Sequence, residues 1–124
     1  MKTDISYRSD LEKLINRFYE KAKMDPVIGH FFGSDSGINW DKHLPIMVTF
    51  WENTLFFTGG YNGDMMGVHR NVHHKNPMKP EHLERWTQLF CLTVGENFEG
   101  ESAERARQRA LGMATMLQIK IPVN

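Results

Sequence analysis

The chain has 124 residues, which is enough for a single domain (residues 1–124) with one core and too few for two. Fifteen basic side chains balance fifteen acidic ones, so the composition does not favour binding to nucleic acid or to an anionic membrane surface. The single cysteine, Cys91, excludes an internal disulfide, and with no apolar leader or membrane-length stretch we expect a cytoplasmic protein.

The first third of the chain predicts one long helix and a short apolar segment. Ser9 and Glu12 have the spacing of a capping box, which indicates a helix that Ser9 caps and that runs to about Lys23, before an Asp-Pro pair. Residues 27–32 form a short apolar turn or helix, and residues 33–37 form a loop. One face of the long helix is apolar, with Tyr19 at its edge: Leu11, Leu14, Ile15, Phe18 and Ala22.

A second long helix is predicted from about Asp41 to Thr58, before a glycine pair. Pro45 is tolerated only in a first turn, so this helix should begin close to Lys42. Its apolar stripe is Leu44, Met47, Val48, Trp51 and Leu55, with Phe50 beside it.

The C-terminal half predicts a short helix at 65–74 and two longer ones. The first of these starts near Pro80 and runs to about Phe98, and the second follows Ser102 as its cap and ends before Pro122. Their inner faces carry, in turn, Leu83, Trp86, Phe90 and Val94, and then Ala103, Ala106, Ala110, Met113 and Leu117.

No segment alternates with the period of a strand, and the chain contains no repeat or linker. The sequence therefore predicts an all-α domain of four substantial helices joined by short turns.

Two of the six histidines draw attention as metal ligands. His69 and His73 are four residues apart, so on a helix they share a face and could chelate a metal, but no carboxylate nearby completes the set. The isolated histidines His30, His74 and His82 are expected to be solvated. Cys91 falls within an apolar-patterned helix and is expected to be inert packing.

Haem binding is the hypothesis that uses several unusual features together. A haem needs one axial histidine on a short helix, an apolar slot and polar groups on the opposite face. His69 follows Met65, Met66 and Val68, an apolar neighbourhood. Polar-tipped side chains lie on or beside apolar stripes and need partners there: Tyr19, His43 and Trp86.

The order of these segments resembles the group III truncated haemoglobins of bacteria over nearly the whole chain. The segments that carry the resemblance are residues 18–21 (FYEK), 40–43 (WDKH), 50–51 (FW), 61–63 (YNG) leading to His69, and 82–86 (HLERW). The resemblance implies a shortened globin fold, a two-over-two helical sandwich around haem b (iron protoporphyrin IX).

The resemblance also implies roles for individual residues. His69 would bind the iron, while Tyr19, His43 and Trp86 would stabilise a ligand on the distal side. The porphyrin contacts expected with it are Phe32, Met47, Met66, Leu83 and Phe90. The ligands would be dioxygen, peroxide or nitric oxide. The protein would act in their chemistry or in sensing, with an unidentified reductase, and not in bulk oxygen delivery. Its small size and balanced charge are compatible with a monomer.

Two other classes stay open at this point. A non-haem metal protein built on His69 and His73 would show no Soret band, and a helical interaction domain would fold without any cofactor. An absorption spectrum taken after addition of hemin separates the three.

Overall fold

The computed structural model describes residues 2–33, 36–59, 67, 69, 73 and 77–120. Within these residues the chain is helical, as expected, and the only extended pairing is an isolated bridge between Thr3 and Phe98. The elements are α1 (Arg8–Met24), the short 3-10 helix η1 (Gly29–Phe31), α2 (Trp40–Phe56), α4 (Pro80–Asn97) and α5 (Glu101–Lys120). Of the short helix expected at 65–74, Gly67, His69 and His73 are helical, and its other residues lie outside the described ones.

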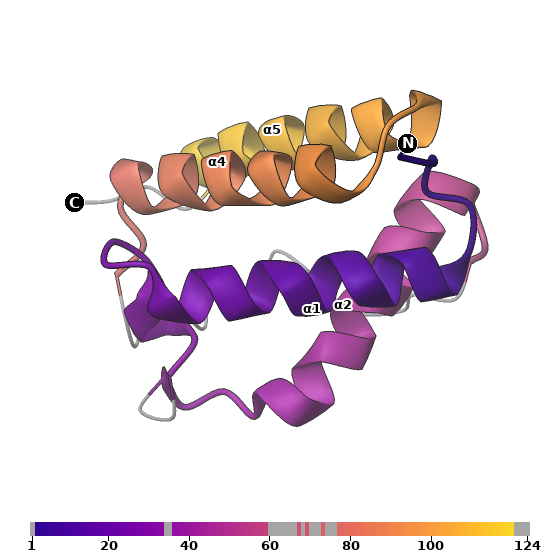
Figure 1. Ribbon diagram of the computed structural model, residues 1–124. Helices are drawn as coiled ribbons and strands as arrows, with labels where there is room; N and C mark the ends of the chain where they lie inside the picture. Colours follow the sequence, from indigo (N-terminus) through magenta and orange to yellow (C-terminus); the bar gives the residue numbers. More distant parts are fainter. Residues whose placement is uncertain are drawn as a thin grey trace.

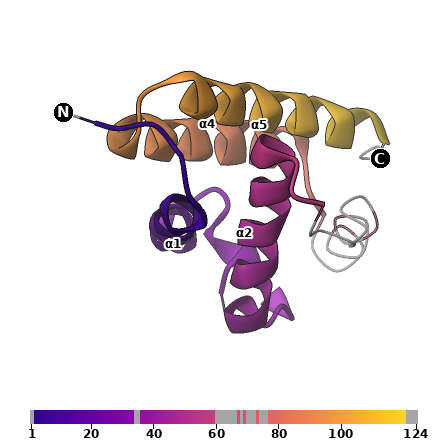
Figure 2. The same ribbon diagram turned by 90° about the vertical axis from the view of Figure 1, so that its right-hand side faces the viewer.

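The helices form two layers. In Figure 1, α4 and α5 run side by side above α1, and Figure 2 shows α2 rising past α1 to reach α5. α1 packs against both α2 and α4, so it holds the two layers together. This is the two-over-two arrangement of helices expected from the resemblance.

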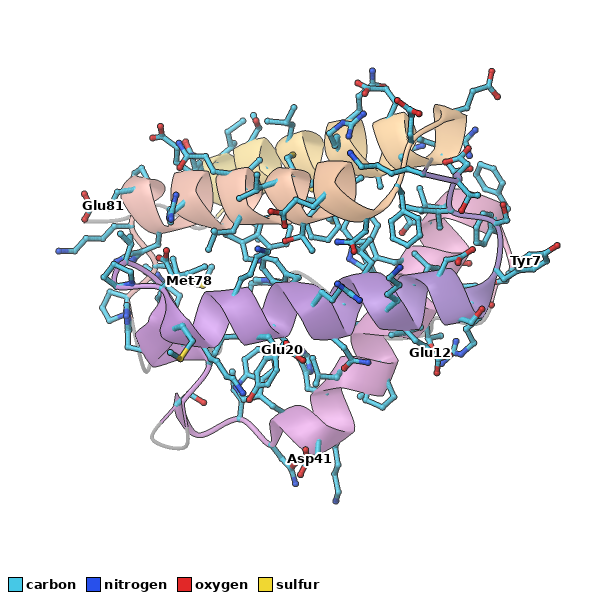
Figure 3. All side chains as sticks on the ribbon, viewed as in Figure 1. Tyr7, Glu12, Glu20, Asp41, Met78 and Glu81 are labelled. Carbon is cyan, nitrogen blue, oxygen red and sulfur yellow. The ribbon has the colours of Figure 1, made fainter. Side chains whose placement is uncertain are left out.

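The buried faces follow the predicted periodicity. The alanines of α5 that line up at helical spacing are buried: Ala103, Ala106, Ala110 and Ala114. Because alanine adds so little volume, α5 can lie close along α4, which is its main neighbour. The outer faces are charged, and Figure 3 shows Glu12 and Glu20 of α1, Asp41 of α2 and Glu81 of α4 on the outside of the molecule.

The expected start of α1 was wrong. Ser9 does not cap α1, which begins at Arg8 after the N-cap residue Tyr7. The carboxylate of Asp10, in the first turn, reaches back and accepts hydrogen bonds from the amides of Ser6 (2.9 Å) and Tyr7 (3.0 Å). A carboxylate in the first turn also lies at the positive end of the helix dipole, which favours it over a hydroxyl.

The bounds of α2 also differ from the prediction. It begins at Trp40, before Lys42, and ends at Phe56, so Pro45 lies inside the helix. The proline removes only the hydrogen bond to the carbonyl of Asp41, which is exposed and can be hydrated. Asn39 caps the start through its side-chain oxygen, which accepts from the amide of Lys42 at 3.4 Å.

The cap of α5 comes from the opposite end of the chain. Asp4, and not Ser102, satisfies the first amides: its carboxylate accepts from Ser102 (2.9 Å) and Ala103 (2.8 Å). Burial alone would raise the pKa of Asp4, but these hydrogen bonds and one from Ile5 outweigh burial and lower the pKa. The N-terminal segment is therefore tied to the start of the last helix.

Gly100 makes this cap possible, and we expect its replacement to be costly. Its φ of 145° is unfavourable for other residues, and a Cβ there would overlap the carboxylate of Asp4. Gly100→Ala should lower the free energy of unfolding by about 1–3 kcal/mol, measured by urea denaturation. The control is Gly112→Ala on α5, where a Cβ meets no atom within 4 Å; a helical alanine there should stabilise by about 0.5–1 kcal/mol. Equal effects of the two variants would contradict the strain at Gly100.

Candidate functional site

A cavity lies between α2, η1, α4 and α5 in the described structure and has a volume of about 380 Å³. Cofactor and ligand sites in proteins occupy about 300–1,000 Å³, so this cavity is large enough for one. Its aromatic lining is Phe31, Phe32, Trp40, Phe50, Trp51 and Trp86. Among the described lining residues no side chain is a carboxylate, amide or hydroxyl, and the polar groups are imidazoles and indoles.

Two histidines contribute to the same cavity from different segments. His43, in the second turn of α2, and the helical His69 both line it, and both are half-buried. Burial lowers the pKa of His43, and the nearby charge of His69 lowers it further. At neutral pH His43 is therefore an uncharged imidazole, and its ring faces the cavity in spite of its place near the start of the helix.

Trp86 reaches the cavity from α4. Its ring stacks on Phe90 (centroids 5.4 Å apart) and meets the edge of Phe18 (5.9 Å), while the indole forms no hydrogen bond within the described structure. Phe90 is fully buried one layer behind, where it also stacks on Trp51 at 4.7 Å. The stacking fixes the plane of Trp86 and leaves its N–H available.

Tyr19 lies behind the cavity wall. Its ring contacts Phe32 and Trp40, which both line the cavity, with centroid distances of 6.1 and 5.7 Å. Its hydroxyl is 3.5 Å from the carbonyl oxygen of Phe32, which is long for a hydrogen bond. The phenol is thus weakly held and close to the cavity, although it is not a lining residue.

The other expected contact residues are placed as follows. Phe32, Met47 and Leu83 line the cavity, and Met66 lies outside the described residues. Met78, at the approach to α4, and Met113 of α5 line it as well; Figure 3 labels Met78. These flexible thioethers suit a cavity that must fit an irregular apolar surface.

His73 is tied to the backbone. Its Nδ1 accepts a hydrogen bond from the amide of Met78 at 2.9 Å, and it is not among the residues that line the cavity. In the described part of the chain no three histidine, cysteine or carboxylate side chains come together as a metal site. A metal held by His69 and His73 would therefore need a third ligand from elsewhere.

The sequence reasoning overlooked Trp40. Its Nε1 is the one buried side-chain nitrogen or oxygen of the described residues that lacks a hydrogen-bond partner. Leaving such a donor unpaired costs about 1–3 kcal/mol. The signal was present in the sequence, because Trp40 follows the capping Asn39 and precedes His43 by three residues, which puts both rings on one face of α2.

The expectation for His82 was wrong. It is half-buried and lines the cavity, because its place two residues after Pro80 turns the ring inward and lets Nδ1 accept from the amide of Lys79 at 2.9 Å. Burial and the neighbouring His30, whose ring centroid is 5.3 Å away, lower the pKa of His82. His30 itself is exposed, as expected.

Cys91 of α4 is half-buried, and burial raises the pKa of its thiol. A thiol that stays protonated is a poor nucleophile, in agreement with the packing role expected for it.

An ion pair between the buried Asp25 and the partly exposed Arg85 braces the site. Asp25, just after α1, accepts from Arg85 Nη2 at 2.8 Å and Nε at 2.9 Å, while its second oxygen accepts from the amides of Val27 and Ile28. Arg85 precedes Trp86 on α4, so this pair joins the end of α1 to the part of α4 that carries the indole. Burial would raise the pKa of Asp25, but the Arg85 hydrogen bond and the two amides lower it overall.

The comparisons with known proteins agree with this geometry. The chain is 28% identical over 121 residues to the group 3 truncated hemoglobin ctb of Campylobacter jejuni, covering 95% of this chain and 93% of that protein. The crystal structure of the group III truncated hemoglobin from Campylobacter jejuni superposes with a TM-score of 0.83 over 96% of this chain and 94% of that one, at 28% identity. The resemblance to group III truncated haemoglobins is confirmed.

The chain therefore has the truncated globin fold. No model of a protein family matches the sequence. In the described part of the chain, no helix of this truncated globin fold is both long and apolar enough to cross a membrane.

The ion pair at Asp25 should make stability depend on pH. Because the folded pKa lies below the ordinary aspartate value of 3.8, the stabilisation is fully present above that value and is lost as the pH falls through the folded pKa. Asp25→Asn should cost about 1–3 kcal/mol of unfolding free energy at pH 7, with the cost shrinking below about pH 4. Urea titrations at both pH values measure this.

The control for Asp25→Asn is Glu20→Gln, since Glu20 is exposed on α1 and forms no ion pair among the described residues. It should change the unfolding free energy by less than about 0.5 kcal/mol. A pH-independent cost of Asp25→Asn would contradict the charged pair.

Proposed function

We propose that this protein binds haem b in the cavity between its helices, with His69 as the axial ligand, and holds diatomic ligands beside it. The observation that carries the proposal is that His69 and two of the three expected distal side chains, His43 and Trp86, line one apolar cavity. The relatives at 28% identity are named as truncated hemoglobins, which supports the same conclusion.

The lining suits the group. A porphyrin is large, flat and apolar on both faces, and the cavity offers indole, phenyl and thioether surfaces with no described carboxylate that would have to be desolvated. The buried, unpaired Nε1 of Trp40 is compatible with a bound group that supplies an acceptor there. When bound, haem would supply an iron centre able to hold a diatomic ligand.

The distal residues would act on the ligand by hydrogen bonding. Trp86 would donate from an indole whose plane is fixed by Phe90. His43 stays neutral at physiological pH, because burial lowers its pKa, and so can donate through one nitrogen without carrying a charge into the cavity. Tyr19 would give up its long contact with Phe32 to donate its hydroxyl proton.

Several donors around a polar ligand slow its escape, since each is worth about 1–3 kcal/mol. We therefore propose that the protein acts in peroxide or nitric oxide chemistry, or in sensing, and not in bulk oxygen delivery. A reductase would return the haem iron to its reduced state. We place the protein and its reductase in the cytoplasm, and the single free, half-buried cysteine is compatible with such a reducing compartment.

Removing the proposed axial ligand tests haem binding. Apoprotein titrated with hemin should develop a Soret band, and its melting temperature should rise because haem binds only the folded form. His69→Ala should change the Soret position and weaken hemin binding by at least about tenfold. His73→Ala, whose ring is bonded to the backbone, is the control and should keep the spectrum of the parent. A His69→Ala protein with an unchanged spectrum would refute His69 as the ligand, and a parent without a Soret band would refute haem binding.

Tyr19→Phe tests the distal donor. Because the variant loses one hydroxyl and little volume, dioxygen should dissociate from the haem-loaded protein several-fold faster, by about 1 kcal/mol in barrier. Stopped-flow mixing measures the rate. Tyr7→Phe, at a tyrosine that is 72% exposed, is the control and should match the parent. An unchanged rate in Tyr19→Phe would remove Tyr19 from this role.

A further inference from the structure

Trp40 has a buried hydrogen-bond donor that no described residue satisfies. Its Nε1 is buried and unpaired, and the ring forms part of the cavity wall. The described lining contributes no carboxylate, amide or hydroxyl oxygen. No described side chain accepts from this N–H, the neighbouring imidazole of His43 included, so a ligand that enters the cavity can supply the acceptor.

The position of the ring is set by its aromatic neighbours. The indole stacks on Phe32 with centroids 4.7 Å apart, is tilted against Tyr19 at 5.7 Å and meets His43 edge-on at 5.1 Å. These contacts need an aromatic ring, and a phenylalanine would provide one without burying a polar group. Packing thus explains the ring of Trp40 and leaves its N–H unexplained.

The neighbours also indicate which acceptor the N–H would meet. Tyr19 and His43 are the side chains to which we assign hydrogen bonds to a diatomic ligand, and Trp40 contacts both. We propose that Trp40 is a further ligand-binding residue, whose indole N–H donates a hydrogen bond to the oxygen of a polar diatomic ligand such as dioxygen. This inference rests on the proposed haem function and extends it to a residue outside the expected distal set.

A hydrogen bond has a signature that packing lacks: it discriminates between polar and weakly polar ligands of the same size. Dioxygen held by haem carries partial negative charge on its outer atom, whereas carbon monoxide carries much less. Loss of a donor should therefore speed the release of dioxygen and leave the release of carbon monoxide nearly unchanged. A merely steric change would alter both rates together.

The kinetic experiment compares the haem-loaded parent with Trp40→Phe, which keeps a ring against Phe32. We expect dioxygen to dissociate roughly three- to tenfold faster from the variant, with the carbon monoxide rate changed by less than about twofold. Leu92→Ala, at an exposed position of α4 (52% exposed), is the matched control and should leave both rates as in the parent. Unchanged dioxygen release, or a parallel change of both rates, overturns the proposal.

A second measurement uses the parent protein and does not depend on the variant being folded. In protein labelled with ¹⁵N in its indoles, the N–H proton of Trp40 should move downfield and exchange more slowly with solvent in the dioxygen form than in the carbon monoxide form. A Trp40 signal identical in both forms overturns the proposal.

Failure of the underlying function would look different. If the parent takes up no hemin, no Soret band appears, and the proposed function falls together with this inference. If the parent and Trp40→Phe bind hemin equally but differ in neither ligand rates nor indole signals, only the role of Trp40 is refuted.

Discussion

A chain of 124 residues that keeps a cavity of about 380 Å³ between its helices needs other contacts to stabilise the fold around that cavity. Small domains bury a smaller fraction of their surface than large ones, and a cavity forfeits packing contacts at the point where they count most. This constraint explains why some helices provide tight packing while others line the cavity. The alanine face of α5 lies close along α4, and α1, which packs against α2 and α4, contributes four fully buried side chains to the core: Leu11, Leu14, Ile15 and Phe18.

The aromatic cluster belongs to both parts of the molecule. Phe18 meets Phe32, Trp86 and Phe90 edge-on, so a fully buried residue of α1 supports rings that form the cavity wall. The same contacts that stabilise the core therefore hold Trp86 in place. The Asp25–Arg85 ion pair adds a polar brace to the same corner. The core and the cavity wall therefore share the same aromatic contacts, and a substitution in the core should shift the rings that line the cavity.

Helical periodicity predicted the long helices well, because the identity of an amphipathic helix is encoded locally in its own residues. The caps were harder to predict. The N-cap of α1 is Tyr7 and not the expected Ser9. At α5, Asp4 accepts from the amides that Ser102 was expected to cap, because the tertiary fold brings the carboxylate to them. His43 could be assigned to an inward-facing position only once α2 was seen to begin at Trp40. Periodicity likewise could not show that Trp40 contacts Tyr19, because these residues lie on different helices.

The cap of α5 has a consequence for how the molecule is made. Asp4 is separated from Ser102 by 98 positions along the chain, so at a synthesis rate of about 5–20 residues per second the carboxylate waits about 5–20 s for the amides that it will bind. The first helix can form during that interval, but the junction that closes the two layers cannot. The junction between the N-terminal segment and the last helix therefore forms only after the start of α5 has been synthesised, and a cofactor that requires this junction is acquired after that point.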